Sequence, residues 1–139
     1  MTRKTGRVQT CNAEDAATRL AHARKFYDAA ELVAVEENVP AALSVAAALA
    51  VLAGIAASDA ACCAALRQRS RGQDHAQAQA LLRQVEPGGV EAARALARLL
   101  DLKDTAHYGL INVSATSLKA ALRQAAALIA FATSTVERG

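Results

Sequence analysis

The sequence predicts an all-α protein, built as an antiparallel up-and-down bundle of four long helices and one short helix. Of its 139 residues, 37 are Ala, whereas only 7 are Gly and 2 are Pro. Ala is the best helix former, and Gly and Pro are the strongest helix breakers. Aromatic residues make up only 3% of the chain, so small side chains must fill most of the core. The composition therefore favours closely packed helices, and the length suits a single domain.

The first eleven residues are predicted to be a flexible basic tail, followed by one domain at 12–139. Arg3, Lys4 and Arg7 carry part of the net charge of +3. A mild basic excess is compatible with binding to RNA or nucleotide phosphates, but does not require it. The polar N-terminus contains no apolar stretch typical of a secretory signal, so we expect a cytoplasmic protein.

The first helix is expected to begin after Asn12 and to run to about Glu37. Asn12 can cap it, and Glu14 and Asp15 complement the helix dipole in its first turn. We place Arg19 on its polar faces. The apolar stripe has helical spacing and consists of Leu20, Ala23, Tyr27, Ala30 and Ala34.

The second helix is expected from Pro40 to about Arg69 and is apolar on every side. Such a helix is surrounded by other helices. Its first part, 40–57, is long enough to suggest a membrane span, but its Ala-rich composition favours the core of a soluble bundle, without a membrane. Gly54 within it indicates a close helix crossing.

Asp59 lies far along this apolar helix and allows two interpretations. A buried carboxylate is costly unless it is paired or hydrogen-bonded. Asp59 therefore either faces water at the edge of the bundle or points toward a polar site near His75.

The three Cys residues are expected to be reduced, because their number is odd and no secretory signal is visible. Cys62 and Cys63 are helical neighbours, so their side chains point about 100° apart. This arrangement suits neither a disulfide nor a shared metal, and we interpret both as small buried hydrophobes. A chain of this size needs no disulfide to fold.

Three more helices are expected in the second half of the chain. A break at Gly72 precedes a short helix that Asp74 can cap, and a turn at 86–89 follows it. The fourth helix is expected at about 90–107, and the fifth at about 114–136 with Ser114 as its cap.

Candidate chemistry lies in two polar segments, R-S-R-G-Q-D-H at 69–75 and K-D-T-A-H-Y-G at 103–109. Lys103 and His107 are four residues apart and share a helix face. A His beside a cation can contact phosphate and act as a general acid or base near neutral pH. The alternative is a solvent-exposed His, with Asp74 serving only as a cap. No phosphate loop, nucleophile elbow or metal-ligand spacing is present, so we expect neither cofactor nor metal.

In the order of its parts, the chain resembles a small stand-alone HEPN domain over about 13–136. The resemblance depends on A-A-S-D-A-A-C-C in the second helix, G-Q-D-H at the start of the third, and L-L-D-L-K-D-T-A-H-Y-G at the end of the fourth. HEPN domains are helical bundles that commonly dimerise. Many are metal-independent endoribonucleases of toxin, defence or RNA-processing systems, whereas others bind a nucleotide or a partner nucleotidyltransferase without catalysis.

Catalytic HEPN domains use an Arg followed, after four to six residues, by a His near the helix that corresponds to the fourth one here. This chain has Lys103 and His107 there, so the Arg is replaced and the spacing is one residue short. Lys lacks the planar fork with which Arg grips a phosphate. Arg69 and His75 match the spacing literally but straddle a helix break elsewhere, and we treat that match as coincidental.

The leading hypothesis is therefore a HEPN-like homodimer that binds RNA, a nucleotide or a partner protein, without catalysis. The surplus of small apolar faces on the first and fifth helices favours the dimer. Tyr108 matches the aromatic residue that often follows the motif in non-catalytic members. The binding residues expected on this basis are Asp59, Asp74, His75, Lys103, His107 and Tyr108.

Two alternative functions remain open. The first is an endoribonuclease, with His107 or His75 as the acid or base and Lys103 or Arg69 as the phosphate-binding cation. The second is a structural interaction module, in which His75 and Lys103 are far apart and face unrelated solvent.

Overall fold

The computed structural model describes residues 8–71 and 74–139, which form five helices and a small two-stranded sheet. The helices are α1 (Ala13–Ala34), α2 (Pro40–Leu66), α3 (His75–Arg83), α4 (Gly89–Tyr108) and α5 (Ala115–Arg138). The antiparallel strands are β1 (Val8–Thr10) and β2 (Gln68–Ser70). The predicted all-α class is confirmed. The expected break at Gly72 and the basic residues Arg3, Lys4 and Arg7 lie outside the described residues.

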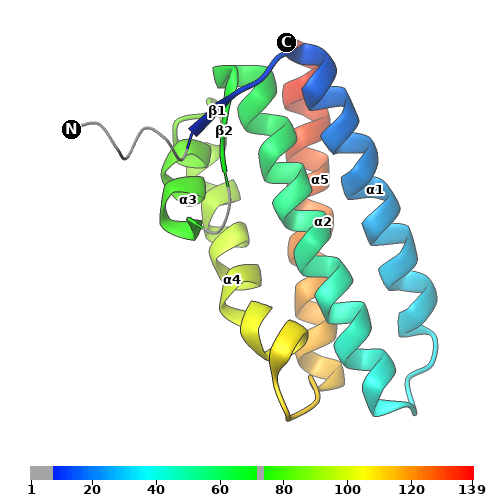
Figure 1. Ribbon diagram of the computed structural model, residues 1–139. Helices are drawn as coiled ribbons and strands as arrows, with labels where there is room; N and C mark the ends of the chain where they lie inside the picture. The colour runs from blue at the N-terminus through cyan, green and yellow to red at the C-terminus, as the bar shows by residue number, and fades with distance from the viewer. Residues whose placement is uncertain (1–7, 72–73) are drawn as a thin grey trace.

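The four long helices run up and down in turn, and α2 lies in the middle of the bundle (Figure 1). The helices α1 and α4 lie on opposite sides of α2, and α5 packs against all three. The short helix α3 packs mainly on α4, at the end of the bundle where α2 meets β2. The helix α2 has bundle helices on three sides and is buried at every residue from 56 to 64, which explains its apolar sequence there, whereas Val45 near its start is half exposed.

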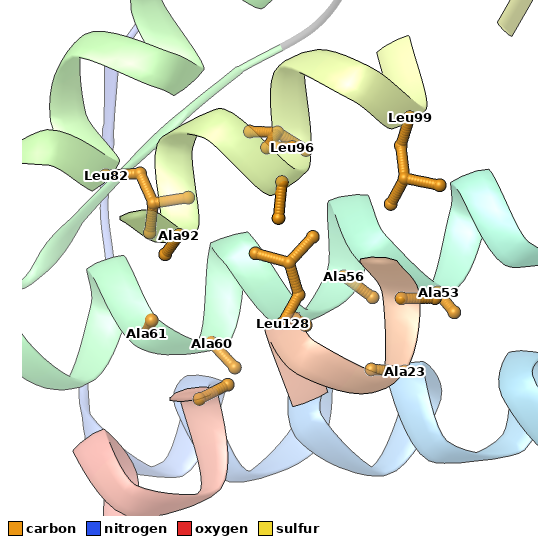
Figure 2. Packing of buried hydrophobic residues seen from close by; sticks show 14 of the residues in the cluster. Ala23, Ala53, Ala56, Ala60, Ala61, Leu82, Ala92, Leu96, Leu99 and Leu128 are labelled. Carbon is orange, nitrogen blue, oxygen red and sulfur yellow. The ribbon is translucent and has the colours of Figure 1, made fainter. Parts of the chain in front are cut away.

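Small side chains allow these helices to approach closely, as Figure 2 shows around Leu99 and Leu128. A Cβ atom added at Gly54 would collide with Cδ1 of Leu99 and would lie 3.2 Å from Cδ1 of Leu128. The close helix crossing predicted from this glycine is therefore confirmed.

The three predicted N-caps are also confirmed. Asn12 and Asp15 form a reciprocal capping box, in which the backbone N–H of Asp15 donates to the Asn12 side chain at 2.8 Å. The Asp74 carboxylate accepts from the backbone of Gln77 at 2.9 Å. The Ser114 hydroxyl accepts from the N–H of Ser117 at 3.1 Å. Each cap satisfies a backbone donor that the first helical turn leaves without a partner.

The end of α2 differs from the prediction, because the helix stops at Leu66 and does not reach Arg69. Arg67 adopts a left-handed conformation with φ of 59°, which turns the chain out of the helix. The next three residues then pair with β1 as strand β2. A tertiary partner from the N-terminus thus replaces the last predicted helical turn.

The predicted flexible tail is wrong for residues 8–11. Val8–Thr10 form β1, and the N–H of Cys11 donates to the carbonyl of Arg67 at 3.0 Å. Residues 1–7 lie outside the described part of the chain.

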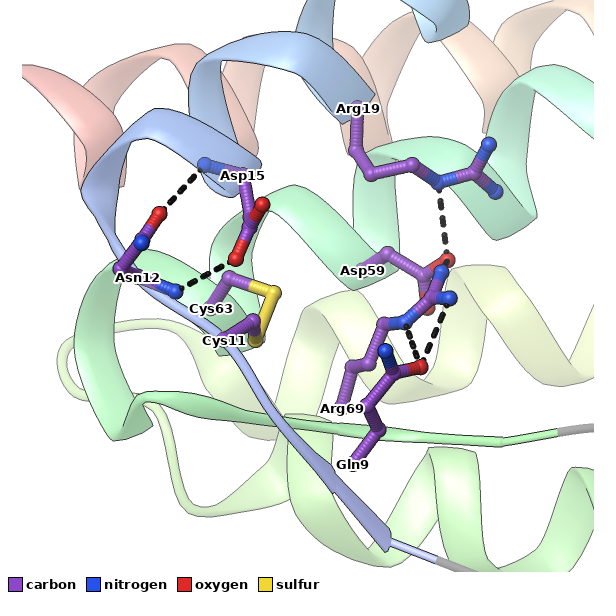
Figure 3. The surroundings of a disulfide bond; sticks show 8 residues. All are labelled: Gln9, Cys11, Asn12, Asp15, Arg19, Asp59, Cys63 and Arg69. Carbon is purple, nitrogen blue, oxygen red and sulfur yellow. Dashed lines mark hydrogen bonds and ion pairs between the residues drawn. A yellow bond between two sulfur atoms is a disulfide. The ribbon is translucent and has the colours of Figure 1, made fainter.

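The expectation of three reduced cysteines is also wrong, because Cys11 and Cys63 form a disulfide (Figure 3). The two residues are 52 apart in sequence, and their Cα atoms are 5.4 Å apart. Disulfide geometry excludes a bond between Cys62 and Cys63, which are neighbours on one helix. It does not exclude a bond from either of them to a cysteine in a distant segment, such as Cys11. Cys62 keeps its thiol and is buried, as predicted.

The helix α2 is long and apolar enough to cross a membrane, with a mean hydropathy of 2.1 in its most apolar window. Within the bundle, 56% of that window is buried, as expected for the core helix of a soluble protein.

Candidate functional site

A cavity of about 360 Å³ opens where α1, α2, α4, β2 and the start of α3 meet. Ligand sites typically have volumes of about 300–1,000 Å³ and combine apolar walls with a few convergent polar groups. The apolar lining residues are Leu52, Ile55, Ala78, Leu96 and Leu100. The polar or charged ones are Arg19, Ser58, Asp59, Arg69, Ser70, Asp74, His75, Lys103, His107 and Tyr108.

All six predicted binding residues line this one cavity. Asp59 comes from the C-terminal half of α2, Asp74 and His75 from the start of α3, and the other three from the end of α4. Their convergence answers the geometric question that the sequence left open. Their participation in binding stays a prediction.

Arg69, expected as a phosphate-binding cation only in the endoribonuclease alternative, also lines the cavity, and so does Arg19, which was expected only on a polar helix face. Arg69 and His75, whose motif-like spacing was treated as coincidental, thus line the same cavity. The sequence signal that could have pointed to such a cation was Asp59, because a buried carboxylate needs a positive partner.

Asp59 bonds to both arginines through one carboxylate oxygen. Its Oδ2 accepts from Nε of Arg19 at 3.0 Å and from Nη1 of Arg69 at 2.9 Å (Figure 3). The Asp59 side chain is only 12% exposed. Burial raises the pKa of this carboxyl above its usual value, although the charges of Arg19 and then Arg69 act in the opposite direction. The cluster holds two positive charges against one negative charge.

Gln9 on β1 orients the Arg69 guanidinium from the other side. Its Oε1 accepts from Nε of Arg69 at 3.2 Å and from Nη2 at 2.9 Å. Gln9 lies opposite Arg69 in the register of the two strands. A guanidinium has five N–H donors in a fixed fork. Arg69 therefore keeps donors for a ligand while two partners fix its position.

The end of α4 forms the opposite wall. Nζ of Lys103 lies 5.3 Å from the centroid of the Tyr108 ring, within the range of a cation–π contact. The Tyr108 ring meets that of His107 edge-on, with the centroids 5.8 Å apart. Tyr108 is 71% exposed, which places it at the rim.

The contact of His107 with α2 assigns its proton. Nε2 lies 3.3 Å from the carbonyl oxygen of Ala48. A carbonyl can only accept, so Nε2 carries the proton, and in the neutral ring Nδ1 is the acceptor. His107 therefore has one nitrogen for a ligand proton.

Asp74 both caps α3 and lines the cavity. Its side chain caps α3, and its backbone carbonyl accepts from the Ser70 hydroxyl at 3.1 Å. The capping interpretation is thus correct and does not remove Asp74 from the site. Among its charged groups the cavity has three cations and two carboxylates, besides the two histidines. This balance favours an anionic group on the ligand.

Comparisons with protein-family models, curated proteins and solved structures found no match for the chain. Within residues 8–71 and 74–139, no group of three or more His, Cys, Asp or Glu side chains is arranged to hold a metal ion.

Proposed function

We propose that this protein binds a mononucleotide in the cavity, without catalysis. The observation that carries the proposal is the convergence of Arg19, Arg69 and Lys103 on one apolar-walled space. Guanidinium and ammonium groups bind phosphate through strong charge-assisted hydrogen bonds.

The shape of the site supports a ligand with both an anionic and an apolar part. Leu52, Leu96 and Leu100 offer a surface for the flat face of a base, while the cations lie around it. A volume of about 360 Å³ is at the small end for ligand sites, which favours one nucleotide over a polymer inside the cavity. An RNA end or a partner protein carrying a nucleotide would use the same chemistry.

The HEPN-like assignment and the predicted dimer stay part of this proposal. The side chains of Val45, Tyr108, Leu110 and Ile111 are exposed near the α4–α5 connector. Large apolar side chains that are exposed together support a contact with a second copy of the chain. The disulfide weighs against the cytoplasm, because reducing systems there keep thiols free.

The proposal can be tested by calorimetric titration of the oxidised protein with AMP, GMP, CMP and UMP. Lys103→Ala is expected to weaken binding about tenfold or more, because a hydrogen bond to a charged group contributes about 1.5–3 kcal/mol. Lys119→Ala is the matched control, since Lys119 is an exposed cation on α5 outside the cavity. Failure of all four nucleotides to bind at millimolar concentration, or equal effects of the two variants, would contradict the proposal.

A second candidate function is metal-independent cleavage of RNA. It is favoured by one observation, that His75 and His107 both line the cavity with Arg69 and Lys103. One imidazole would accept the proton of a 2′-hydroxyl as its oxygen attacks the phosphorus, and the other would protonate the leaving 5′-oxygen. The products would be a 2′,3′-cyclic phosphate and a 5′-hydroxyl.

RNA incubated with the protein in EDTA tests this candidate. Cyclic-phosphate ends that disappear in His107→Ala would support cleavage. Intact RNA at high protein concentration would leave the binding proposal alone. The structural-module alternative expects His75 and Lys103 to be far apart and to face unrelated solvent. The position of both residues in one cavity disfavours it.

A further inference from the structure

We propose that the Cys11–Cys63 disulfide is an exchange site for low-molecular-weight thiols, and that its opening weakens ligand binding in the cavity by releasing Gln9 from Arg69. The exchange itself is independent of the proposed nucleotide binding. The effect on binding rests on that proposed function.

A small cleft gives access to the disulfide. It has a volume of about 140 Å³, and both Cys11 and Cys63 line it. Cys11 is 8% exposed, whereas Cys63 is fully buried. Cys11 is thus the more accessible residue of the pair, and we expect the thiol to attack its sulfur.

The charges around this cleft suit a thiolate, which is the attacking form of a thiol. Two arginines, Arg19 and Arg69, and one carboxylate, that of Asp15, line the cleft, whereas Asp59, which bonds to both arginines, lines the larger cavity. These two arginines also line the larger cavity, so the two sites share a wall.

The exchange has two balanced steps. A thiolate attacks Sγ of Cys11, the S–S bond breaks, and Cys63 leaves as a thiolate that takes up a proton. A second small thiol then attacks the mixed disulfide and releases Cys11 as a thiol. In total, two small thiols are oxidised to one small disulfide, and the protein disulfide is reduced to two thiols.

The neighbouring Cys62 does not take part. It is buried, and burial together with the nearby charge of Asp59 raises the pKa of its thiol to about 12. Cys62 is therefore almost entirely protonated at neutral pH and does not rearrange the disulfide. The oxidised protein has one defined pair.

The disulfide is connected to the cavity through β1. Without it, β1 is held by three residue pairs with β2 and by the bond from Cys11 N–H to the Arg67 carbonyl. A two-stranded ribbon of this length is marginally stable in water. When β1 detaches, Arg69 loses both hydrogen bonds to Gln9 and keeps only Asp59. The expected result is weaker binding and not its abolition.

The first experiment measures the exchange itself in the full-length oxidised chain. 2-Mercaptoethanol is added under native conditions, free thiols are alkylated at intervals, and tryptic peptides are analysed by mass spectrometry. We expect a rate that rises linearly with thiol concentration and a mixed disulfide on the peptide 8–19, which contains Cys11. A rate that levels off at the global unfolding rate, or a mixed disulfide on Cys63, would overturn the exchange site.

The second experiment measures AMP affinity in oxidised and in dithiothreitol-reduced protein. We expect about tenfold weaker binding after reduction, in the wild type and in Cys62→Ser, which keeps the disulfide. Oxidised Gln9→Ala should bind as weakly as reduced wild type, and reduction should change it little. Equal affinity of oxidised and reduced wild type would refute the coupling.

The outcomes separate the two proposals. If the oxidised wild type binds no nucleotide, the proposed function fails, and the exchange kinetics still decide on the site. If reduction unfolds the chain, as circular dichroism would show, Gln9→Ala decides on the coupling because it retains the disulfide. Full affinity in Gln9→Ala would then refute it.

Discussion

Asp59→Asn is the most informative single change, because it is expected to separate the stability of the site from its affinity for anions. Asn has almost the same shape as Asp, and its amide oxygen can still accept from one guanidinium. The change removes the negative charge that Arg19 and Arg69 share at 3.0 and 2.9 Å. The positive charges of both arginines are then no longer offset by this carboxylate.

The stability effect follows from the pKa of Asp59. Because burial raises this pKa, the carboxyl holds its proton more tightly in the folded protein than in the unfolded chain. The stabilising contribution of the group is therefore fully present below the unfolded pKa, about 3.9, and is lost as the pH rises through the folded value. Asn resembles the neutral acid. The free energy of unfolding of Asp59→Asn at pH 7 should equal or exceed that of the wild type, within about 1 kcal/mol.

The expected effect on affinity comes from the charge that the ligand meets, and not from the burial of Asp59. Removing one negative charge beside the proposed phosphate position should strengthen AMP binding at least about fivefold, which corresponds to about 1 kcal/mol. Increasing salt should reduce this gain, because salt screens charges near the surface.

Urea unfolding at pH 4 to 8 and calorimetric titration with AMP measure the two effects. Glu91→Gln is the control, since Glu91 forms an exposed ion pair with Arg94, neither residue lines the cavity, and the change should affect neither quantity. A loss of more than about 2 kcal/mol in Asp59→Asn would show that the ion pairs outweigh desolvation and would refute the reasoning. Weaker binding of AMP would refute the proposed place of the phosphate.

Three further predictions follow from the packing and the thiols. Gly54→Ala should destabilise the protein by about 1–3 kcal/mol in chemical unfolding, because its Cβ collides with buried Leu99, and Leu99→Ala in the same chain should relieve part of that cost. Cys62 should resist iodoacetamide in the native protein at pH 8, since burial raises the pKa of its thiol to about 12. It should react at once in denaturant, and fast labelling of the native protein would contradict its burial. The wild type should sediment as a dimer and Ile111→Asp as a monomer, whereas Val90→Asp at the other end of α4 should remain dimeric; a monomeric wild type would end the dimer proposal.

The features that the sequence predicted correctly depend on near neighbours in the chain. The caps at Asn12, Asp74 and Ser114 need only a polar side chain three residues before a backbone N–H. The shared face of Lys103 and His107 needs only a helix. Such local rules also identified the polar segments 69–75 and 103–109 as candidates for a site. They could not show that the folded chain brings the two segments together.

The features that the sequence did not predict all join residues far apart. Arg19 is 40 residues from Asp59, and their contact depends on how α1 lies against α2. In the sequence, Arg19 resembles any cation on a polar helix face. Most of strand β2 was predicted as helix, because its partner β1 lies about 60 residues earlier in the chain.

Composition and local spacing thus specify an Ala-rich helical bundle, its N-caps and six of the polar side chains around its cavity, because helix formation and capping act over a few residues. The Cys11–Cys63 bond, the hairpin that it anchors and the Arg19–Asp59–Arg69 cluster arise only when the helices pack, because each requires groups 10 to 60 residues apart to come within bonding distance. These long-range contacts supply two of the three cations in the cavity.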